Sequence, residues 1–434
     1  MRPDGSRADI HDPGHGMDIH RGLDGSRRII VDRPDHSRIF VARGGVGYVQ
    51  HPYVFHGREF AQRTYWVNGH SYARFYARYP YHGVFLEVYA PVRFYPVGFY
   101  GWAYNPWARP VSYGWGWGGN PWYGYYGFYF APYPVYAGPA FWLTDYLIAT
   151  SLQAQYAAQA QAQANAQYAA AGGGPVLTPD VKAQIADEVK YDVQQENLAA
   201  QANAANPQGP PPDTSVGALL SDGRPHVFVA GANLDLVDAG SGAECAITEG
   251  DVVQVASPPA PDAPQVNAIV LASKGGNECP RTAMVTVALT DLQDMQNHMR
   301  ETVDQGMAEL QAKQGQGGLP PAPPADVAPP ATAGFAQGAP PPDPNAQAEI
   351  SAQATAANQV EQQDASAANA AVADGSAGAA QGGPPPTISI GQTPDQVIAA
   401  VGQPTRIVDL GAKKIFTYPD MKVIFMNGTV SDVQ

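Results

Sequence analysis

Apolar and polar positions alternate in short runs over residues 28–93 of this 434-residue chain, and turn residues separate the runs. That pattern is typical of a meander of antiparallel strands. The clearest hairpin spans residues 64–72, because its central Asn68-Gly69 pair favours a two-residue turn with positive φ at both positions. We therefore expect an antiparallel β unit here.

Residues 94–136 follow with no regular period, and Tyr, Trp, Phe, Gly and Pro supply most of them. Glycine and proline recur too often for a long helix or a central strand, and the stretch is too interrupted to span a membrane. All seven tryptophans of the chain lie between Tyr48 and Tyr146. The pattern predicts one aromatic β module over residues 27–140, whose rings must be covered by the chain, by another copy or by a ligand.

Three later segments have the spacing of amphipathic helices. The first covers residues 141–171, where apolar residues at steps of four give way to an Ala/Gln tract, and the second covers 178–205 and begins at Thr178-Pro179-Asp180. The third covers residues 290–312, with Thr290 as its expected N-cap. Its predicted apolar face consists of Leu292, Met295, Met299, Val303, Met307 and Leu310.

Residues 217–289 contain several short candidate strands divided by Gly, Asp and Pro clusters, which predicts a small all-β domain, a barrel or a sandwich, flanked by the helices. Both cysteines of the chain, Cys245 and Cys279, lie in it. In an oxidising compartment they would form a disulfide, whereas in the cytosol they would be two buried thiols.

Two segments lack an apolar period and are expected to be disordered, namely residues 1–26 and the Pro/Ala/Gln-rich linker 313–386. The formal charge of −14 is divided unevenly, because residues 1–110 are basic and the remainder is acidic. The acidic low-complexity parts indicate solvated linkers rather than a surface for nucleic acid.

The C-terminal segment, residues 387–434, predicts one helix followed by a three- or four-stranded meander, an α-β-β-β module. Thr393 and Gln396 form a capping-box pattern, and Gly402 with Pro404 marks the end of the helix. The expected fold class is therefore multidomain α+β, with the modules joined by long linkers.

The runs over residues 390–404 and 413–430 resemble the SmpA/OmlA, or BamE-like, modules. That resemblance implies a small envelope-side binding module, but the lipidated cysteine and the usual first helix of those lipoproteins are missing, so their assembly role does not follow. The aromatic half, with W-L-T-D-Y at residues 142–146, is similar to Tyr/Gly/Trp-rich bacterial envelope proteins to which no function is attached. The positions of residues 387–434 that match the BamE-like motif are Gly391, Thr393, Val397, Gly402, Pro404, Tyr418, Phe425 and Gly428.

No motif for catalysis, for a cofactor or for a metal stands out. The chain has no G-x-S-x-G, H-E-x-x-H or phosphate-loop sequence. Glu87 and Asp145 are the only carboxylate pair worth considering, and nothing in their spacing requires one. Histidine is the only candidate for metal binding, and the spacing of the histidines matches no zinc site. The candidates are His11, His15 and His20, with Asp12 and Asp18 nearby, and the pair His51 and His56.

The leading hypothesis is a non-enzymatic cell-envelope or surface protein that acts as a structural or protein-interaction scaffold. It places the chain in the periplasm or at the outer membrane, with its signal peptide upstream of Met1, because residues 1–26 contain no apolar h-region. The alternative is a protein that binds polysaccharide or peptidoglycan through exposed ring faces. The rings expected to form that surface are Trp102, Trp107, Trp115, Trp117 and Trp122.

The expected partners are therefore envelope proteins or cell-wall polysaccharide, with association at a membrane but no transmembrane helix. Nucleic acid is not expected, because the arginines of residues 58–109 lie among tyrosines on which their guanidinium planes can stack within the module itself.

Overall fold

The computed structural model describes residues 8–42, 45–67, 70–81, 84–160, 176–259, 263–276, 278–323, 328–377, 388, 392–404, 406–410, 413–418, 421–426 and 429–433. The chain divides into two compact units. We call residues 11–357 the large unit, and residues 1–10 with 358–434 the C-terminal unit. Helices and antiparallel sheets occur in both, which confirms the α+β class.

A meander of eight antiparallel strands in sequence order opens the chain. Val67 pairs with His70 and closes the hairpin predicted between them, although the turn residues Asn68 and Gly69 lie outside the described residues. The strands are β1 (Asp9–Asp12), β2 (Met17–Arg21), β3 (Arg27–Asp32), β4 (Arg38–Val41), β5 (Gly47–Phe55), β6 (Arg58–Val67), β7 (His70–Tyr81) and β8 (Val84–Ala90).

The expectation of disorder over residues 1–26 is wrong for residues 8–26, which contain β1 and β2. Met17 and Ile19 of β2 are buried, and they pair with Val31 and Ile29 of β3. The segment has too few apolar residues to show a period by itself. Its two apolar side chains are sufficient because the next strand supplies the rest of the buried surface.

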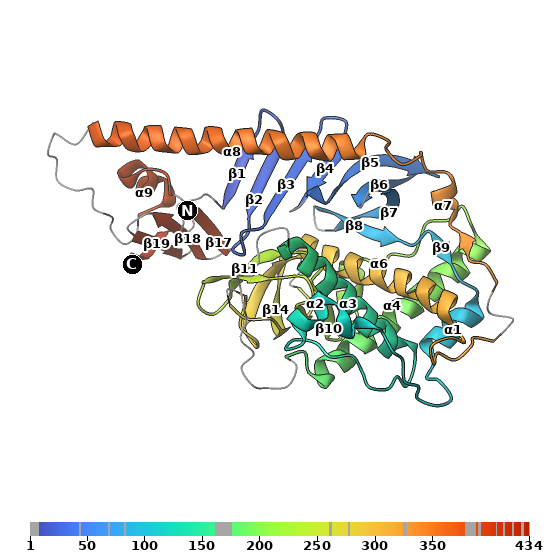
Figure 1. The fold of residues 1–434 in the computed structure, drawn as a ribbon. Coiled ribbons are helices and arrows are strands. Elements are labelled where there is room, and N and C mark those ends of the chain that lie inside the picture. The colour runs from blue at the N-terminus through green and yellow to red at the C-terminus, as the bar shows by residue number, and fades with distance from the viewer. Residues whose placement is uncertain are drawn as a thin grey trace. The chain divides into compact units, whose positions relative to one another are not determined.

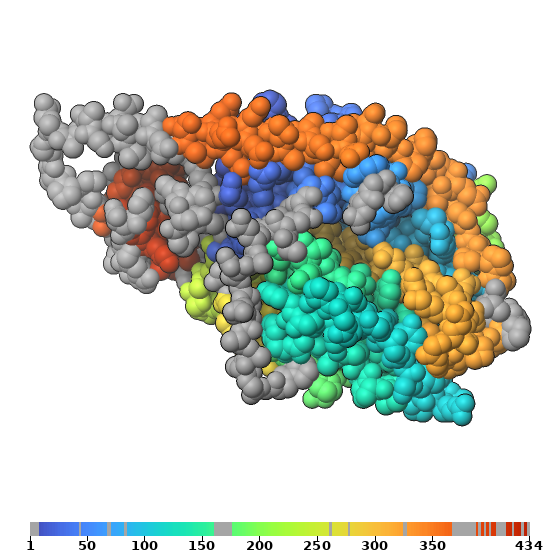
Figure 2. Space-filling model, viewed as in Figure 1, coloured from blue at the N-terminus to red at the C-terminus, as the bar shows by residue number. Residues whose placement is uncertain are grey.

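The aromatic segment, residues 94–136, contains short helical turns between irregular stretches. Its rings pack on one another and on the helices that follow, so Tyr100, Tyr129 and Phe130 are fully buried. Figure 2 shows this segment, in cyan to teal, as part of the continuous surface of the large unit. The rings are therefore covered largely by the chain itself. The elements are β9 (Arg93–Phe94), α1 (Val97–Tyr104), η2 (Trp117–Gly119) and α2 (Pro121–Tyr126).

The three predicted helices are present as α3 (Pro139–Ala160), α4 (Pro179–Ala205) and α6 (Leu289–Lys313), with a short α5 (Val216–Leu220) between the last two. Thr178 caps α4 as expected, because its side chain accepts a hydrogen bond from the Val181 amide. The cap predicted at Thr290 is wrong, since α6 begins after Ala288 with no side-chain cap. The Ala/Gln tract beyond Ala160 lies outside the described residues up to position 175.

The second sheet of the large unit has six strands in the order β10-β13-β14-β15-β11-β12. Its ends, β10 and β12, do not pair with each other, so the sheet is open and the barrel, one of the two predicted alternatives, is wrong. Cys245 in β12 is bonded to Cys279, with their Cα atoms 4.8 Å apart. The strands are β10 (His226–Val229), β11 (Leu234–Asp238), β12 (Glu244–Ile247), β13 (Val252–Val255), β14 (Gln265–Ala272) and β15 (Met284–Ala288).

Helix α6 lies at the centre of the large unit, between the meander and the second sheet (Figure 1). On one side its Asn297 binds the backbone of Tyr89 in β8, and on the other the Met299 sulfur accepts a hydrogen bond from Val229 in β10. The predicted apolar face of α6 is buried, and so are polar residues on its other faces, among them Gln293, Arg300 and Glu301. The helix thus replaces the second layer that a sandwich would need.

The disordered linker expected over residues 313–386 is wrong for much of its length. β16 (Ala331–Thr332) pairs with β9, and α7 (Gly334–Gln337) stacks Phe335 on Phe60 of the meander with ring centroids 5.0 Å apart. α8 (Ala346–Ala377) follows, with Ile350 buried near its start. The segment has no apolar face of its own, but it supplies single apolar side chains to a sheet already rich in rings. Residues 378–387 lie outside the described residues.

In addition to the part of α8 from residue 358 onward, the described residues of the C-terminal unit form the helix α9 and a four-stranded antiparallel sheet in sequence order, which agrees with the predicted meander of three or four strands. Its capping box is confirmed, because the Thr393 and Gln396 side chains each accept a hydrogen bond from the backbone amide of the other residue. The helix ends at Gly402, whose φ of 89° favours glycine. The elements are α9 (Pro394–Val401), β17 (Arg406–Leu410), β18 (Lys413–Tyr418), β19 (Met421–Met426) and β20 (Thr429–Val433).

Val397, Tyr418 and Phe425 of the predicted motif lie in the core of the C-terminal unit. The Tyr418 hydroxyl donates to the Gly402 carbonyl at 3.1 Å and so fastens the end of the helix to the sheet. Pro404 follows this helix end, whereas Gly391 and Gly428 lie outside the described residues. These motif positions therefore support the fold of the unit.

Candidate functional site

A cavity of about 510 Å³ opens beside α6, where β7, β8 and the start of the aromatic segment meet it. A second hollow, of about 390 Å³, continues from it past Arg93 and Tyr95 toward Thr332 of β16. Together they form a groove in the large unit. The ring-bearing and charged residues that line the first cavity are Tyr72, Arg74, Tyr89, Arg93, Tyr95, Glu301 and Asp304.

Two regular elements supply the groups at the floor of the cavity. In β7 the alternation of side chains places Tyr72, Arg74 and Tyr76 on one face of the sheet. In α6, Glu301 and Asp304 are three residues apart, so both carboxylates project from one side of the helix. The spacing of both elements thus directs these side chains toward one place.

Glu301 is held from two sides by the meander. Arg74 makes an ion pair with it, and the Tyr76 hydroxyl donates to its other carboxylate oxygen. The Arg74 guanidinium also lies over the rings of Tyr65 and Tyr72, at 5.1 and 5.2 Å from their centroids. Arg74 and Glu301 are therefore held in place by several contacts. The ring of Tyr72, which lines the cavity and is 39% exposed, stacks on Tyr65 with ring centroids 5.3 Å apart.

Asp304 lines the cavity and has one carboxylate oxygen without a hydrogen-bond partner among the described residues. The Tyr89 hydroxyl donates to Oδ2 of Asp304 at 3.0 Å, whereas Oδ1 is buried and has no hydrogen-bond partner among the described residues. Burial raises the pKa of this carboxyl to about 6. Behind it Glu196 of α4 is fully buried, and burial together with the Asp304 charge raises its pKa. A buried acceptor without a donor is costly, so Asp304 Oδ1 marks an unsatisfied polar position next to the cavity.

The same polar layer continues along α4 and α6. Arg300 is 2% exposed and donates to the Tyr89 carbonyl at 2.9 Å and to Thr214 Oγ1 at 2.6 Å. One turn before Glu196 lies Asp192, which is also 2% exposed. Burial, with a smaller contribution from the Glu188 charge, raises the pKa of Asp192 to about 8. This carboxyl therefore carries a proton at neutral pH in the folded chain.

Asp192 makes the stability of the large unit depend on pH. Its pKa is about 8 in the folded chain, against about 3.9 in the unfolded chain. The folded state therefore binds more protons between those values, and stability falls as pH rises. The contribution of Asp192 is expected to decrease by about 1.4 kcal/mol per pH unit between pH 6 and 7.5. Urea unfolding at both pH values should show a shallower decrease in the Asp192→Asn variant.

The matched control is Asp187→Asn on the same helix, because the Asp187 side chain is 74% exposed. This variant should retain the pH dependence of the unchanged protein. An Asp192→Asn variant with the same slope as the control would contradict the assignment of the proton to Asp192.

The tryptophans proposed as a binding surface lie mostly inside the aromatic segment. Trp107 and Trp122 are buried, with 8% and 7% exposure, so their faces are closed to a ligand. Trp102, Trp115 and Trp117 are half-buried and pack against the core. Trp115 stacks between Trp117 at 4.3 Å and Trp142 at 4.6 Å. These rings form a stacked cluster rather than a row of open faces.

The carboxylates considered as a pair belong to different networks. Glu87 is 2.7 Å from Arg63, and Asp145 is 2.6 Å from Lys182. The predicted stacking of arginine on tyrosine within the module is confirmed, since the Arg63 guanidinium lies 3.9 Å from the ring centroid of Tyr76.

Four of the candidate histidines, His20 with Asp235 among them, pair with carboxylates in the large unit, whereas the His56 ring packs edge-on against Phe55. His11 binds Asp18 at 2.6 Å, His15 binds Asp12 at 2.7 Å, and His51 binds Asp343 at 2.8 Å. Among the residues that the structure describes, no three His, Cys, Asp or Glu side chains are grouped as metal ligands. In the same part of the chain, no helix combines the length and apolar character needed to cross a membrane.

No family model, curated protein or solved structure matches this chain. The likeness of residues 387–434 to BamE-like modules therefore stays a prediction. Sequence reasoning missed the cavity beside α6 because Arg74 and Glu301 are 227 residues apart, and each looks like part of a solvated face. A usable signal was the Tyr-x-Arg-x-Tyr alternation at residues 72–76.

Proposed function

We propose that this chain is a non-enzymatic, exported envelope or surface protein whose large unit binds a cell-wall saccharide in the groove beside α6. The observation that carries the proposal is the combination of the partly exposed Tyr72 ring with the Arg93 and Asp304 side chains in the lining of one open cavity. Sugar rings present C–H faces that stack on aromatic rings, and hydroxyls that donate to carboxylates and accept from guanidinium groups. The cavity volume of about 510 Å³ lies within the range of roughly 300–1,000 Å³ typical of ligand sites.

Export is supported by the bond between Cys245 and Cys279, since disulfides persist mainly in oxidising compartments. Non-reducing peptide mapping of protein taken from its natural host tests this part. The two cysteines should be recovered as one linked peptide pair, and two free thiols in native material would contradict export.

The binding proposal is tested by calorimetric titration of the full chain with soluble peptidoglycan fragments. Tyr72→Ala removes an exposed ring from the cavity, and Asp304→Asn replaces the charge by an amide. Each should weaken binding about tenfold, because a stacked ring or a charge-assisted hydrogen bond contributes roughly 1–2 kcal/mol. If no peptidoglycan fragment binds the native chain, the saccharide assignment is refuted.

Tyr104→Ala is the matched control, because Tyr104 is 42% exposed and does not line the groove. It should leave the affinity unchanged. Equal losses in Tyr72→Ala and Tyr104→Ala would place binding on the general aromatic surface instead of in the groove.

A scaffold role with envelope proteins as partners is the second candidate. It is favoured by the C-terminal unit, which is compact by itself and has its own core around Val397 and Phe425. This role and saccharide binding by the large unit are compatible in one chain.

A further inference from the structure

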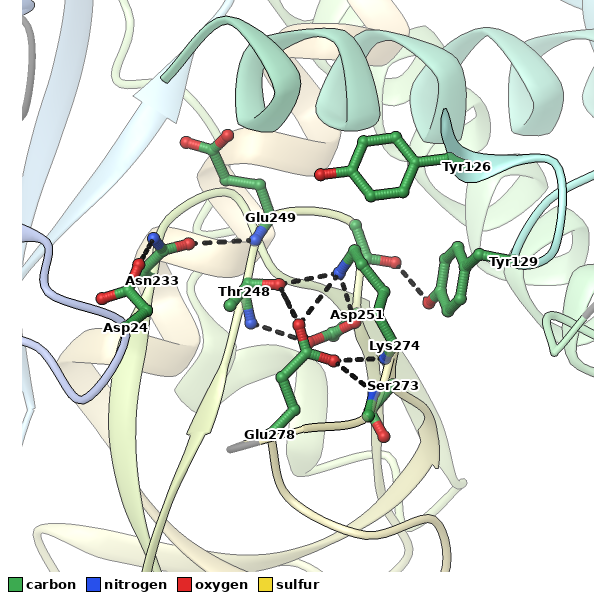
Figure 3. A network of polar contacts seen from close by, with 12 residues as sticks. Asp24, Tyr126, Tyr129, Asn233, Thr248, Glu249, Asp251, Ser273, Lys274 and Glu278 are labelled. Atoms are coloured by element: carbon green, nitrogen blue, oxygen red, sulfur yellow. Dashed lines mark hydrogen bonds and ion pairs between the residues drawn. The ribbon is translucent and has the colours of Figure 1, made fainter. Parts of the chain in front are cut away.

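Three ionisable side chains come together at neighbouring strand ends of the second sheet of the large unit (Figure 3), namely those of Lys274, Asp251 and Glu278. Asp251 directly precedes β13, and Lys274 follows the end of β14, the strand paired with it. The Lys274 Nζ atom is 2.5 Å from Asp251 Oδ1 and 3.7 Å from Glu278 Oε1. An amine, a carboxyl group and a second carboxyl group thus come together at neighbouring strand ends.

The three side chains are enclosed. The Asp251 side chain has no exposed surface, and those of Lys274 and Glu278 are 7% and 11% exposed. The buried Tyr129 covers the site, with its ring centroid 5.0 Å from Lys274 Nζ and its hydroxyl bound to the Gly250 carbonyl at 2.8 Å. Such an enclosure excludes bulk water, and a condensation that releases water is favoured where bulk water is excluded.

Burial disfavours charge on Asp251. Burial, with a smaller contribution from the Glu278 charge, raises the pKa of this carboxyl to about 7. Asp251 is therefore partly protonated at neutral pH, and its carboxyl group lies beside the Lys274 amine. The condensation requires a protonated carboxyl group, which can lose its hydroxyl group as water, and an amine in its free form, because only a free amine is nucleophilic.

Glu278 is fixed in position beside the pair. Its Oε2 accepts hydrogen bonds from the backbone amides of Lys274 and Gly275, and its Oε1 accepts from the Thr248 hydroxyl at 2.6 Å. The next residue is Cys279, whose disulfide and whose amide bond to the Ala246 carbonyl attach this loop to β12. A carboxylate held in this way can receive a proton and return it without moving far.

We propose that Lys274 and Asp251 condense to an intramolecular isopeptide bond, with Glu278 transferring the proton. The Nζ lone pair attacks Cγ of Asp251, and Glu278 takes a proton from the nitrogen and delivers it to the departing hydroxyl group. The N–C bond forms, the C–OH bond breaks, and one water leaves. The ammonium and carboxylate charges disappear together, and no oxidant or cofactor is required.

The bond would link β13 covalently to the end of β14, in addition to the disulfide that joins β12 to the same loop. It would also remove a buried ion pair, whose desolvation is costly in a closed site. The proposal does not depend on saccharide binding, because Asp251 and Lys274 do not line the groove.

Intact-mass measurement of the full chain with its disulfide retained tests the proposal. Here the full sequence mass is that of the chain less the two hydrogens lost in the disulfide. The native protein should be lighter than this value by the mass of one water, and a digest should contain one branched peptide that joins Lys274 to Asp251. Lys274→Arg and Glu278→Gln should both have the full sequence mass. Glu249→Gln, which changes a neighbouring acid outside the triad, should retain the loss of water.

Circular dichroism and disulfide mapping show whether each variant folds, so a full mass in a folded Glu278→Gln chain supports the proton-transfer role. A folded native chain with its full sequence mass would refute the bond itself. A water loss that persists in Glu278→Gln would refute the assignment of the proton transfer to this residue, and a loss located at another peptide would refute the site.

Discussion

Trp142→Ala is expected to lower the free energy of unfolding of the large unit by about 3–5 kcal/mol, the cost of truncating a large buried ring. Trp142 has no exposed surface. Its ring stacks on Trp115 at 4.6 Å and on Tyr146 at 5.6 Å, with the edge of Tyr113 at 5.7 Å. The cavity left by this truncation cannot close easily, because the neighbouring rings are themselves locked. Urea unfolding followed by far-ultraviolet circular dichroism measures the loss without relying on tryptophan fluorescence.

Trp102→Ala is the control for this substitution. Trp102 is half-buried, and its ring contacts are Phe99 at 5.4 Å and Trp107 at 6.1 Å. Its truncation should cost less than half as much. Equal losses, or a loss below about 1 kcal/mol for Trp142→Ala, would mean that the aromatic segment is not a packed core.

Lys182→Met should destabilise the large unit by about 3–5 kcal/mol, because it leaves a buried charge without its partner. Lys182 of α4 is 3% exposed, and its Nζ lies 2.6 Å from Asp145 Oδ1, which is in a side chain with no exposed surface. Burial already raises the pKa of Asp145, and it lowers the pKa of Lys182. The raised pKa of Asp145 and the lowered pKa of Lys182 show that the buried environment disfavours a charge on each side chain when its partner is absent.

The double variant Lys182→Met/Asp145→Asn should recover most of that loss. An asparagine there retains an oxygen that can accept from the Tyr133 amide and the Tyr136 hydroxyl, which lie 2.6 and 2.7 Å from Asp145 Oδ2. Lys190→Met on the same helix is the control, because its ion pair with Asp187 is largely exposed, and such pairs contribute about 0–1 kcal/mol. A double variant as unstable as Lys182→Met would show that the lysine acts through packing, for example over the Tyr133 ring.

The local patterns of the sequence were sufficient to predict most of the regular elements. Alternation predicted the central strands of the meander, the Thr178 and Thr393 caps predicted two helix starts, and the two cysteines in one β region form a pair. Each of these features depends on residues a few positions apart or on the chemistry of one residue type. Such signals do not require knowledge of the tertiary structure.

The features that were missed depend on distant partners. The spacing of α6 predicted one apolar face, yet Glu301 and Arg300 on its other faces are buried because the meander and the α4 region supply their counterparts. The second sheet is open because α6 covers it, and strand lengths alone do not distinguish an open sheet from a closed one. Phe335 could not be recognised as a core residue, because the rings that receive it lie in the meander.

The central position of α6 has a consequence for the order in which the chain folds. The side-chain hydrogen bonds between α6 and β7 or β8 join residues 208 to 227 positions apart, whereas each strand of the meander pairs with its neighbour in sequence. During synthesis the meander can therefore form early, while its Arg74 and Tyr76 face stays open until α6 emerges. Closing a loop of that length is slow compared with hairpin formation. The aromatic segment is synthesised within that interval, so its rings are available for unwanted contacts until α6 emerges.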